Sequence, residues 1–211
     1  MKLHSIRTEY KYAELTENSI DKNPLKQFDL WLNDAINAKV NEPTAMSVVT
    51  VGIDGFPDSR MVLLKDYNEN GFTFFTNYNS QKGKAIEKNH AVGLHFFWPE
   101  LERQIRISGF AEKTSTEISD QYFNSRPVLS QIAAIVSNQS SKIPSREFLQ
   151  EQFENLKNKY KTENPERPDT WGGFVVKPVK FEYWQGRESR LHDRILYENE
   201  NGSWIISRLS P

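Results

Sequence analysis

Short runs of β-branched and aromatic residues, separated by turn signals, occupy the chain between residues 45 and 111 and constrain its fold most strongly. Asp54-Gly55 and Asn68-Glu69-Asn70-Gly71 are typical of tight turns between strands. The pattern predicts five strands, at residues 46–51, 59–65, 72–76, 92–98 and 104–111. Four of them follow one another in hairpin-like succession, which favours an antiparallel sheet that curls or closes.

Helical patterns flank the predicted sheet. Asn23-Pro24 is a helix-start signal. The apolar stripe of the helix that follows comprises Leu25, Phe28, Leu32, Ala35 and Ile36. Residues 80–88 have helical composition, and Thr114-Ser115-Thr116-Glu117 fits a capping box that opens a helix through Phe123. Arg126-Pro127 interrupts this helix, because the residue before a proline avoids the α region.

Helical character resumes at residues 128–136 and returns at 145–161. The expected buried side of the last helix comprises Phe148, Leu149, Phe153, Leu156 and Tyr160. Three strands then close the chain, at residues 173–184, 190–198 and 203–208, with an Asn-Gly turn between the last two. We therefore predict a mainly β fold with flanking helices. The polar residues 1–22 are predicted to form an N-terminal arm, and residues 23–211 a single domain.

Composition excludes several classes of protein. Lys and Arg total 27 against 28 Asp and Glu, so the chain lacks the global basic field that nucleic-acid binders usually have. Without Cys it has no disulfide and no thiolate nucleophile, which suits a reducing compartment. The sequence has neither a signal-like apolar run near Met1 nor a stretch of membrane-spanning length. We expect a cytoplasmic protein with neither nucleic-acid nor membrane partners.

Several catalytic motifs are also missing from the sequence. It has no nucleophile elbow, no Walker loop, no dinucleotide-binding glycine pattern and no zinc-protease helix. Metal-ligand spacing is lacking among the four histidines, His4, His90, His95 and His192. We predict no metal site, and the hydrolase, P-loop and zinc classes lose support.

Two strand-end segments carry cations that suit an anion. Arg60 and Lys65 end an apolar strand, and a regular strand places them on opposite faces. Arg60 and Lys65 can therefore bind one ligand only if a bulge or the strand end changes the direction of one side chain. The structural alternative is that both are ordinary strand-end charges that extend into water. At Ser80-Gln81-Lys82 a strand gives way to a helix, where backbone N–H groups, the helix dipole and Lys82 suit a phosphate.

A third pattern offers polar groups at helical spacing. Tyr122, Arg126 and Ser130 recur at intervals of four and present a phenol, a guanidinium and a hydroxyl, which together suit a phosphate. The structural alternative is an ordinary helix cap beside an exposed tyrosine. Gln104 and Gln139-Ser140 offer neutral amides and a hydroxyl that suit either the edge of a heteroaromatic ring or turn chemistry.

The segment from Trp184 to Arg194 gathers cationic and protonatable side chains. If residues 190–194 run as a strand, Arg190, His192 and Arg194 share one face. Like charges on one face repel, and an anionic partner relieves that repulsion. The structural alternative is an exposed edge strand whose charged side chains prevent aggregation, and it would show the same spacing.

These segments, taken in order, resemble the pyridoxine/pyridoxamine 5'-phosphate oxidase family from Arg7 to the C-terminus. The most specific matches are Ser59 to Lys65, Tyr122 to Pro127, Ser137 to Ser141, Trp184 to Gly186 and Arg190 to Arg194. The resemblance implies an FMN-binding split β-barrel, antiparallel and Greek-key-like, in a homodimer with FMN at the subunit interface. It also implies oxidation of pyridoxine or pyridoxamine 5'-phosphate to pyridoxal 5'-phosphate, with dioxygen reduced to hydrogen peroxide.

The resemblance also implies roles for individual residues. Those expected around FMN are Arg60, Met61, Val62, Leu63, Leu64, Lys65, Phe75, Thr76, Gln81, Lys82, Gln104, Gln139, Ser140, Trp184 and Arg194. Those expected at the substrate phosphate are Lys65, Tyr122, Arg126 and Ser130. Arg190 and His192 are implied at the pyridine ring as the catalytic pair, and Arg7 with Tyr10 on an arm that closes over the substrate.

Two positions depart from the common family pattern. Gln81 stands where many members have Arg, which removes one cationic phosphate contact, and Phe75 replaces a common Tyr. Three alternatives remain: another split-barrel flavin oxidoreductase, a flavin or pyridoxal-phosphate carrier without turnover, and a curled-sheet nucleic-acid binder. Another split-barrel flavin oxidoreductase would lack the group Tyr122, Arg126 and Ser130 that suits a phosphate. The near-neutral net charge of the chain disfavours a nucleic-acid binder.

Overall fold

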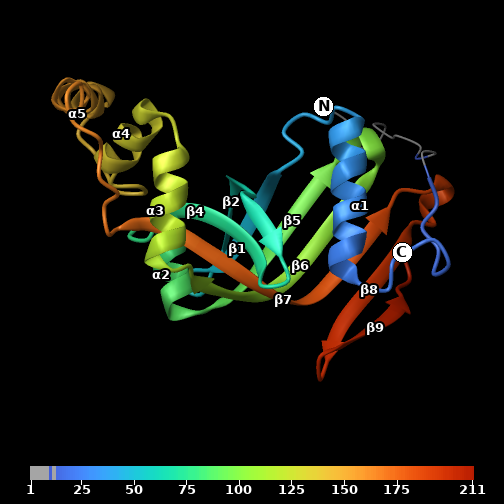
Figure 1. Cartoon of the computed structure of the whole chain (residues 1–211). Helices are drawn as coiled ribbons and strands as arrows, with labels where there is room; N and C mark the ends of the chain where they lie inside the picture. The colour runs from blue at the N-terminus through green and yellow to red at the C-terminus, as the bar shows by residue number, and fades with distance from the viewer. Residues whose placement is uncertain (1–9, 11–12) are drawn as a thin grey trace, which may run out of the picture.

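The computed structural model describes residue 10 and residues 13–211, which form an antiparallel sheet flanked by helices (Figure 1). The strands are β1 (Ala45–Val51), β2 (Pro57–Leu63), β3 (Asp66–Asn68), β4 (Gly71–Asn77), β5 (Ala91–Trp98), β6 (Arg103–Lys113), β7 (Trp171–Gln185), β8 (Asp193–Glu200) and β9 (Ser203–Arg208). The helices are α1 (Pro24–Asn37), α2 (Gln81–Lys88), α3 (Thr116–Ser125), α4 (Val128–Val136) and α5 (Arg146–Lys159), with 3-10 turns η2 (Pro99–Leu101) and η3 (Glu188–Arg190). The predicted mainly β architecture with flanking helices is confirmed.

The long strand β7 pairs with β6, β4 and β8, and so joins the strands β2-β1-β5-β6 to the β4-β3 and β8-β9 pairs. The strand order is β2-β1-β5-β6-β7-β4-β3; β8 also pairs with β7, and β9 with β8. The first half of β7 pairs with β4, and its second half pairs with β8. The register between β6 and β7 shifts at Ser108/Gly109, and a β carbon on Gly109 would lie 2.3 Å from the Lys177 carbonyl oxygen. This irregularity bends the sheet, as β-bulges do.

Helix α1 covers the sheet with an aromatic contact. The Asn23 side chain caps the helix by accepting hydrogen bonds from the Leu25 and Lys26 N–H groups. Phe28 is fully buried, and its ring meets Phe72 and Phe96 edge-on at centroid distances of 4.9 and 5.1 Å. The predicted helix start is confirmed. Ile36, however, is 49% exposed, so the apolar stripe is narrower at its C-terminal end than predicted.

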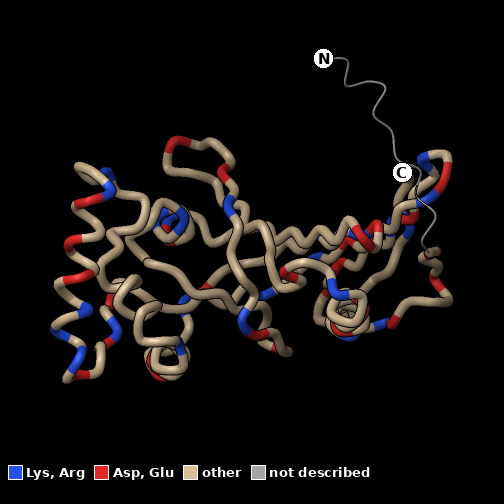
Figure 2. Tube along the Cα trace, turned by 90° about the horizontal axis from the view of Figure 1, so that it is seen from above, with Lys and Arg blue, Asp and Glu red and all other residues tan. Residues whose placement is uncertain are grey.

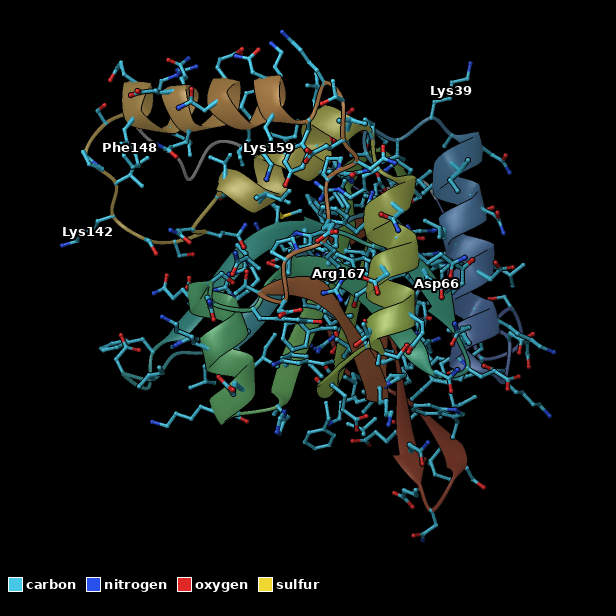
Figure 3. All side chains as sticks on the ribbon, turned by 60° about the vertical axis from the view of Figure 1, so that its left-hand side comes forward. Lys39, Asp66, Lys142, Phe148, Lys159 and Arg167 are labelled. Atoms are coloured by element: carbon cyan, nitrogen blue, oxygen red, sulfur yellow. The ribbon has the colours of Figure 1, made fainter. Side chains whose placement is uncertain are left out.

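Three further sequence predictions need correction. Ser115, one residue later than predicted, caps α3, because Thr114 hydrogen-bonds to Ser119 and to the Gly173 carbonyl instead. Strand β2 ends at Leu63, so Lys65 lies beyond the strand end and not on its alternating faces. The predicted buried side of α5 is only half-buried, since α5 lies along the outside (Figure 3): Leu149, Phe153, Leu156 and Tyr160 are partly exposed, and Phe148 is exposed.

Basic and acidic residues alternate along the described trace, without a large region of one sign (Figure 2). This distribution agrees with the nearly balanced totals of 27 basic and 28 acidic residues. Electrostatic recognition in this protein therefore depends on local groups.

Candidate active site

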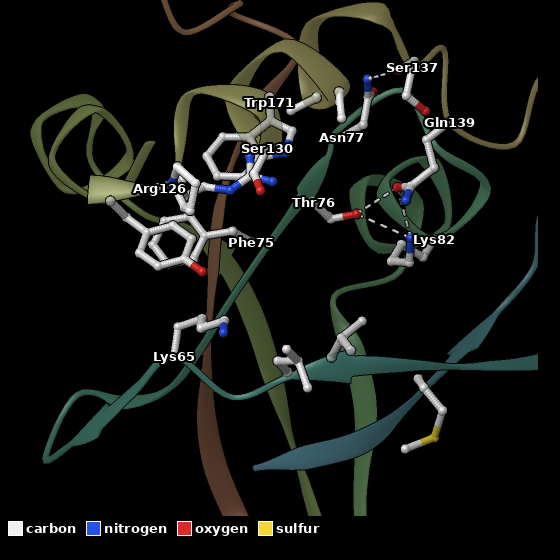
Figure 4. A pocket seen from close by; sticks show the side chains of 17 residues that line it. Lys65, Phe75, Thr76, Asn77, Lys82, Arg126, Ser130, Ser137, Gln139 and Trp171 are labelled. Carbon is white, nitrogen blue, oxygen red and sulfur yellow. Dashed lines mark hydrogen bonds between the residues drawn. The ribbon is translucent and has the colours of Figure 1, made fainter. Parts of the chain in front are cut away.

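A cavity of about 600 Å³ lies between the sheet and the α3–α4 corner (Figure 4). Residues from five segments line it: the end of β2, strand β4, helix α2, the α3–α4–loop region and the start of β7. The residues are Met61, Val62, Leu63, Lys65, Phe75, Thr76, Asn77, Lys82, Tyr122, Arg126, Pro127, Ser130, Ala133, Ala134, Ser137, Gln139 and Trp171. Both predicted cation groups, at Lys82 and at Arg126, thus border one cavity.

One end of the cavity is built around Lys82. Its Nζ donates hydrogen bonds to Thr76 Oγ1 at 3.1 Å and to Gln139 Oε1 at 3.0 Å (Figure 4). Thr76 Oγ1 also donates to Gln139 Oε1 at 2.8 Å. Both partners are neutral, so the positive charge of Lys82 is held in place without being cancelled. An unneutralised ammonium beside a hydroxyl and an amide suits a phosphate.

The local sequence places Lys82 in this buried position. Ser80 caps α2 by accepting from the Gly83 N–H group, and a β carbon on Gly83 would lie 2.1 Å from the Tyr78 carbonyl oxygen. Glycine therefore lets α2 approach the chain closely, and Lys82 is only 6% exposed. Burial, together with the nearby positive charge of Arg60, lowers the pKa of Lys82 to about 8.

The other end of the cavity carries Arg126. Arg126 follows α3 in an extended conformation (φ −77°, ψ 149°), because Pro127 disfavours the α region for it. Its Nη1 atom is buried and has no hydrogen-bond partner among the described residues. Ser130, Tyr122 and Lys65 line the same cavity, so the structure brings together the residues that were predicted to share a phosphate. A buried guanidinium donor without a partner indicates a site for an anion.

A second group of predicted residues surrounds Trp184. The His192 ring lies 4.6 Å from the Trp184 ring, and the Tyr10 ring meets both edge-on at 5.7 Å. The Arg187 N–H group donates to His192 Nδ1 at 3.1 Å. Burial, with the charge of Arg190, lowers the pKa of His192. Because Nδ1 accepts the hydrogen bond from Arg187, the neutral form of His192 carries its proton on Nε2.

The predicted strand over residues 190–194 is wrong in its first half. Ser189 and Arg190 have φ values of 55° and 62°, and β8 begins only at Asp193. Arg190 therefore ends the turn η3, and the alternation that placed three charges on one face does not hold. Positive φ at successive residues reverses the chain, which a strand cannot do.

Arg194 extends from β8 beside Trp184, its cross-strand partner on β7. Its Nε atom donates to Glu182 Oε1 at 2.9 Å, and its Nη1 atom to the Ser210 carbonyl oxygen at 2.7 Å. Gln104 is the partner of Trp184 on the other side, on β6, so the three residues form one row across the sheet. Cross-strand neighbours of this kind contact one another directly.

The remaining predicted residues lie outside the cavity lining. Arg60 pairs with Asp58 and donates to Thr50 Oγ1 at 2.8 Å. Leu64 is buried in the hydrophobic core, and Gln81 and Ser140 are exposed. The cavity lining likewise includes none of Tyr10, Gln104, Trp184, Arg190, His192 and Arg194. Arg7 lies outside the described residues.

Six residues that line the cavity were not predicted from the sequence: Asn77, Pro127, Ala133, Ala134, Ser137 and Trp171. Asn77 donates from Nδ2 to the Ser137 carbonyl oxygen at 3.2 Å and so ties β4 to the end of α4. Trp171, at the start of β7, forms a wall beside Arg126. The Gly172-Gly173 pair was an available signal for Trp171, because adjacent glycines in a strand often mark a close approach of other groups.

The described residues lack two kinds of feature. They contain no cluster of His, Cys, Asp or Glu arranged to hold a metal ion. None of their helices combines the length and apolar character needed to cross a membrane.

Matches to known families show which family the chain belongs to. Residues 32–160 match the family model described as pyridoxamine 5'-phosphate oxidase. Residues 171–211 match the model described as the pyridoxine 5'-phosphate oxidase C-terminal dimerisation region. The chain belongs to the pyridoxine/pyridoxamine 5'-phosphate oxidase family. The resemblance drawn from the sequence motifs is confirmed.

Members of this oxidase family match the chain from end to end. A pyridoxine/pyridoxamine 5'-phosphate oxidase of Haemophilus influenzae strain 86-028NP is 53% identical over 211 residues, which is 100% of both chains. One from Nostoc punctiforme is 50% identical over 207 residues, covering 98% of this chain and 97% of the relative.

Solved structures of this oxidase fold agree with the architecture. The PhzG protein of Burkholderia lata 383, in complex with tetrahydrophenazine-1-carboxylic acid, superposes with a TM-score of 0.87 at 27% identity, covering 94% of this chain and 98% of that one. A pyridoxamine 5'-phosphate oxidase-related, FMN-binding protein of Nostoc punctiforme reaches 0.73 at 16% identity, covering 91% and 100%. The second likeness concerns the fold alone.

Proposed function

We propose that this chain oxidises pyridoxine 5'-phosphate or pyridoxamine 5'-phosphate to pyridoxal 5'-phosphate with FMN as cofactor. Dioxygen accepts the electrons and becomes hydrogen peroxide, and the amine substrate also consumes water and releases ammonia. One observation carries the proposal: a single cavity has an unneutralised cation at each end, Lys82 and Arg126. The cofactor and the substrate each bring one phosphate, so two such cations are required.

The Lys82 end suits the FMN phosphate. Lys82 Nζ is held there by Thr76 Oγ1 and Gln139 Oε1, which accept its hydrogen bonds, and Arg60 is close enough to lower the pKa of Lys82. The residues proposed to hold FMN from this chain are Arg60, Met61, Val62, Leu63, Leu64, Lys65, Phe75, Thr76, Gln81, Lys82, Gln139 and Ser140. The substrate phosphate is proposed at Lys65, Tyr122, Arg126 and Ser130.

A homodimer completes the proposed site. Strands β8 and β9 lie at the far end of the sheet from α3, α4 and α5 (Figure 1). Gln104, Trp184, Arg190, His192 and Arg194 therefore serve the cavity of the partner protomer. An isologous two-fold interface gives two such shared cavities, and the matched dimerisation region, residues 171–211, contains most of this group.

The chain's own residues bind and orient the reactants. FMN, when bound, supplies a two-electron acceptor that dioxygen reoxidises. The Arg126 end holds the substrate by its phosphate and so positions the C4' carbon at a constant place. Arg190 supplies a cation and neutral His192 an Nε2–H donor, which orient the pyridine ring and stabilise charge on its phenolic oxygen.

The N-terminal segment is proposed to cover this half of the site. Arg187 binds Glu14, and Arg208 binds both Glu17 and Asp193. These contacts hold the chain leading back to Tyr10 beside His192. We propose that residues 1–22 form an arm and residues 23–211 form one domain. We also propose a cytoplasmic location, because a cysteine-free chain suits a reducing compartment.

FMN affinity is expected to fall as the pH rises through about 8. In the FMN-free protein Lys82 has a pKa of about 8, so its ammonium form dominates below that pH and is lost above it. The phosphate requires the ammonium, so the Kd should rise by up to about tenfold per pH unit well above 8. Titration of FMN fluorescence against apoprotein from about pH 7 to 9.5 measures this slope.

The Lys82→Arg variant is the control for this slope, because a guanidinium stays protonated over the whole range. A flat profile is expected for it. An equal slope in the variant would assign the pH dependence to another group.

The direct test of the function combines a spectrum with an assay of two substrates. The purified protein should show a flavin absorption spectrum, or gain one with FMN, and should form hydrogen peroxide and pyridoxal 5'-phosphate from either phosphorylated substrate. A protein that binds no FMN and is inert with both substrates would contradict the proposal. The likeness to PhzG, whose structure is a complex with tetrahydrophenazine-1-carboxylic acid, favours one other candidate, an enzyme that acts on a compound of that kind. Turnover of such a compound, with no turnover of either phosphorylated pyridine substrate, would support it.

A further inference from the structure

Arg126 differs from most described arginines in what holds its side chain. Arg60 pairs with Asp58, Arg103 with Asp34, and Arg167 with Asp120. The Arg126 guanidinium instead lies over the indole of Trp171, with Cζ 4.8 Å from the ring centroid (Figure 4). No ion pair of Arg126 occurs within the described part of the chain, and its Nη1 atom has no hydrogen-bond partner there.

An aromatic support has a specific consequence for a guanidinium. The N–H donors of arginine point outward in the guanidinium plane, whereas an indole attracts the cation through its ring face. A carboxylate in the same place would occupy two of the donors and cancel the charge. Trp171 therefore restrains Arg126 while leaving its donors and its full charge available to an anion in the cavity.

Trp171 is itself held rigidly. It is 6% exposed, and its carbonyl oxygen accepts from Arg167 Nη1 at 2.7 Å. Arg167 Nε in turn donates to Asp120 Oδ1 on α3 at 2.6 Å. This bond anchors the segment before β7 to α3, the helix that Arg126 directly follows. The indole also stacks nearly parallel to Tyr122, at an interplanar angle of 7°. Such a support keeps the guanidinium in one orientation before any ligand arrives.

We propose that Trp171 is a positioning residue that makes the site selective for phosphorylated ligands, by presenting Arg126 with its donors free. This inference rests on the proposed function, since it takes the phosphate at Arg126 to be that of the substrate. It predicts that loss of the indole weakens binding of the phosphate group and leaves recognition of the pyridine ring unchanged.

Binding of pyridoxal 5'-phosphate and of pyridoxal to the FMN-loaded protein tests the proposal. Trp171→Leu should raise the Kd for pyridoxal 5'-phosphate about tenfold and leave that for pyridoxal unchanged, because cation–π contacts contribute at this level. Trp171→Phe, which keeps a ring face, should restore most of the affinity. In the oxidase assay the loss should fall on KM more than on kcat. Equal weakening of both ligands would overturn the proposal.

Two further variants separate positioning from packing. Phe123 meets the Trp171 ring edge-on at 5.4 Å, so Phe123→Leu disturbs the same packing, and it should lower thermal stability without changing ligand selectivity. Arg126→Met, which removes the cation, should remove the benefit of Trp171, so the double variant with Trp171→Leu should bind about as weakly as Arg126→Met alone. If the two substitutions together raised the Kd by the product of their separate effects, Trp171 would not act through Arg126.

The binding measurements need no turnover, and inorganic phosphate serves as a competing probe. A wild-type protein without oxidase activity would refute the proposed function, and the loss of selectivity in Trp171→Leu would still be measurable. A Trp171→Leu protein with unchanged affinity for inorganic phosphate and for pyridoxal 5'-phosphate would refute the positioning role while the oxidase activity stands.

Discussion

Arg190→Ala is expected to retain FMN and to lose most of its turnover. Arg190 ends η3 beside His192, is exposed in the single chain, and has no ion pair among the residues that the structure describes. Its charge is thus available to the substrate ring that the proposed dimer would place beside it. Loss of a charged group aligned with developing negative charge typically costs about 100-fold in kcat.

The measurement is the ratio of flavin to protein absorbance together with steady-state peroxide formation. Arg146→Ala is a matched control, because Arg146 is exposed on α5 and also has no ion pair within the described residues. Its turnover and FMN content should equal those of the wild type. If Arg190→Ala had wild-type kinetics, Arg190 would be an ordinary surface charge at the edge of the sheet.

Mixing Arg126→Ala with Arg190→Ala is expected to restore activity that neither variant has alone. Arg126 belongs to the cavity of its own chain, whereas Arg190 is proposed to serve the cavity of the partner. In a hybrid dimer one site carries both defects and the other carries none. Random exchange of equal amounts makes about half of the dimers hybrid, so about a quarter of all sites are intact.

Co-expression of the two variants with different affinity tags, followed by purification through both tags, gives the hybrid for assay. Arg126→Ala with Lys65→Ala is the matched control. Both of these residues line the same cavity, so no hybrid site escapes damage and activity should stay low. Hybrids of Arg126→Ala and Arg190→Ala without restored activity would place both residues in the site of one chain.

Local signals in the sequence were sufficient for most of the secondary structure. The Asn23 cap, the break at Pro127 and the turn at Asn201-Gly202 all occur as predicted, because each depends on backbone conformations set within a few residues. The strand predicted over residues 190–192 does not form, because its spacing pattern fits more than one local backbone conformation. Period-two spacing cannot distinguish a strand from a turn that happens to carry alternating charges, and in the structure a turn at Glu188–Arg190 precedes His192, whose ring packs against Trp184.

Sequence motifs were also sufficient to indicate the two groups of cationic residues at the cavity and to identify the family, because these depend on residue types in a particular order. Only the tertiary structure decided how each group is used. It pairs Arg60 with Asp58, buries Lys82 between two neutral partners and leaves Arg126 on the face of Trp171. These outcomes depend on contacts between segments far apart in the chain, which no local pattern records. The sequence by itself therefore determined the elements and the chemistry, and long-range packing decided which charges remain free to bind.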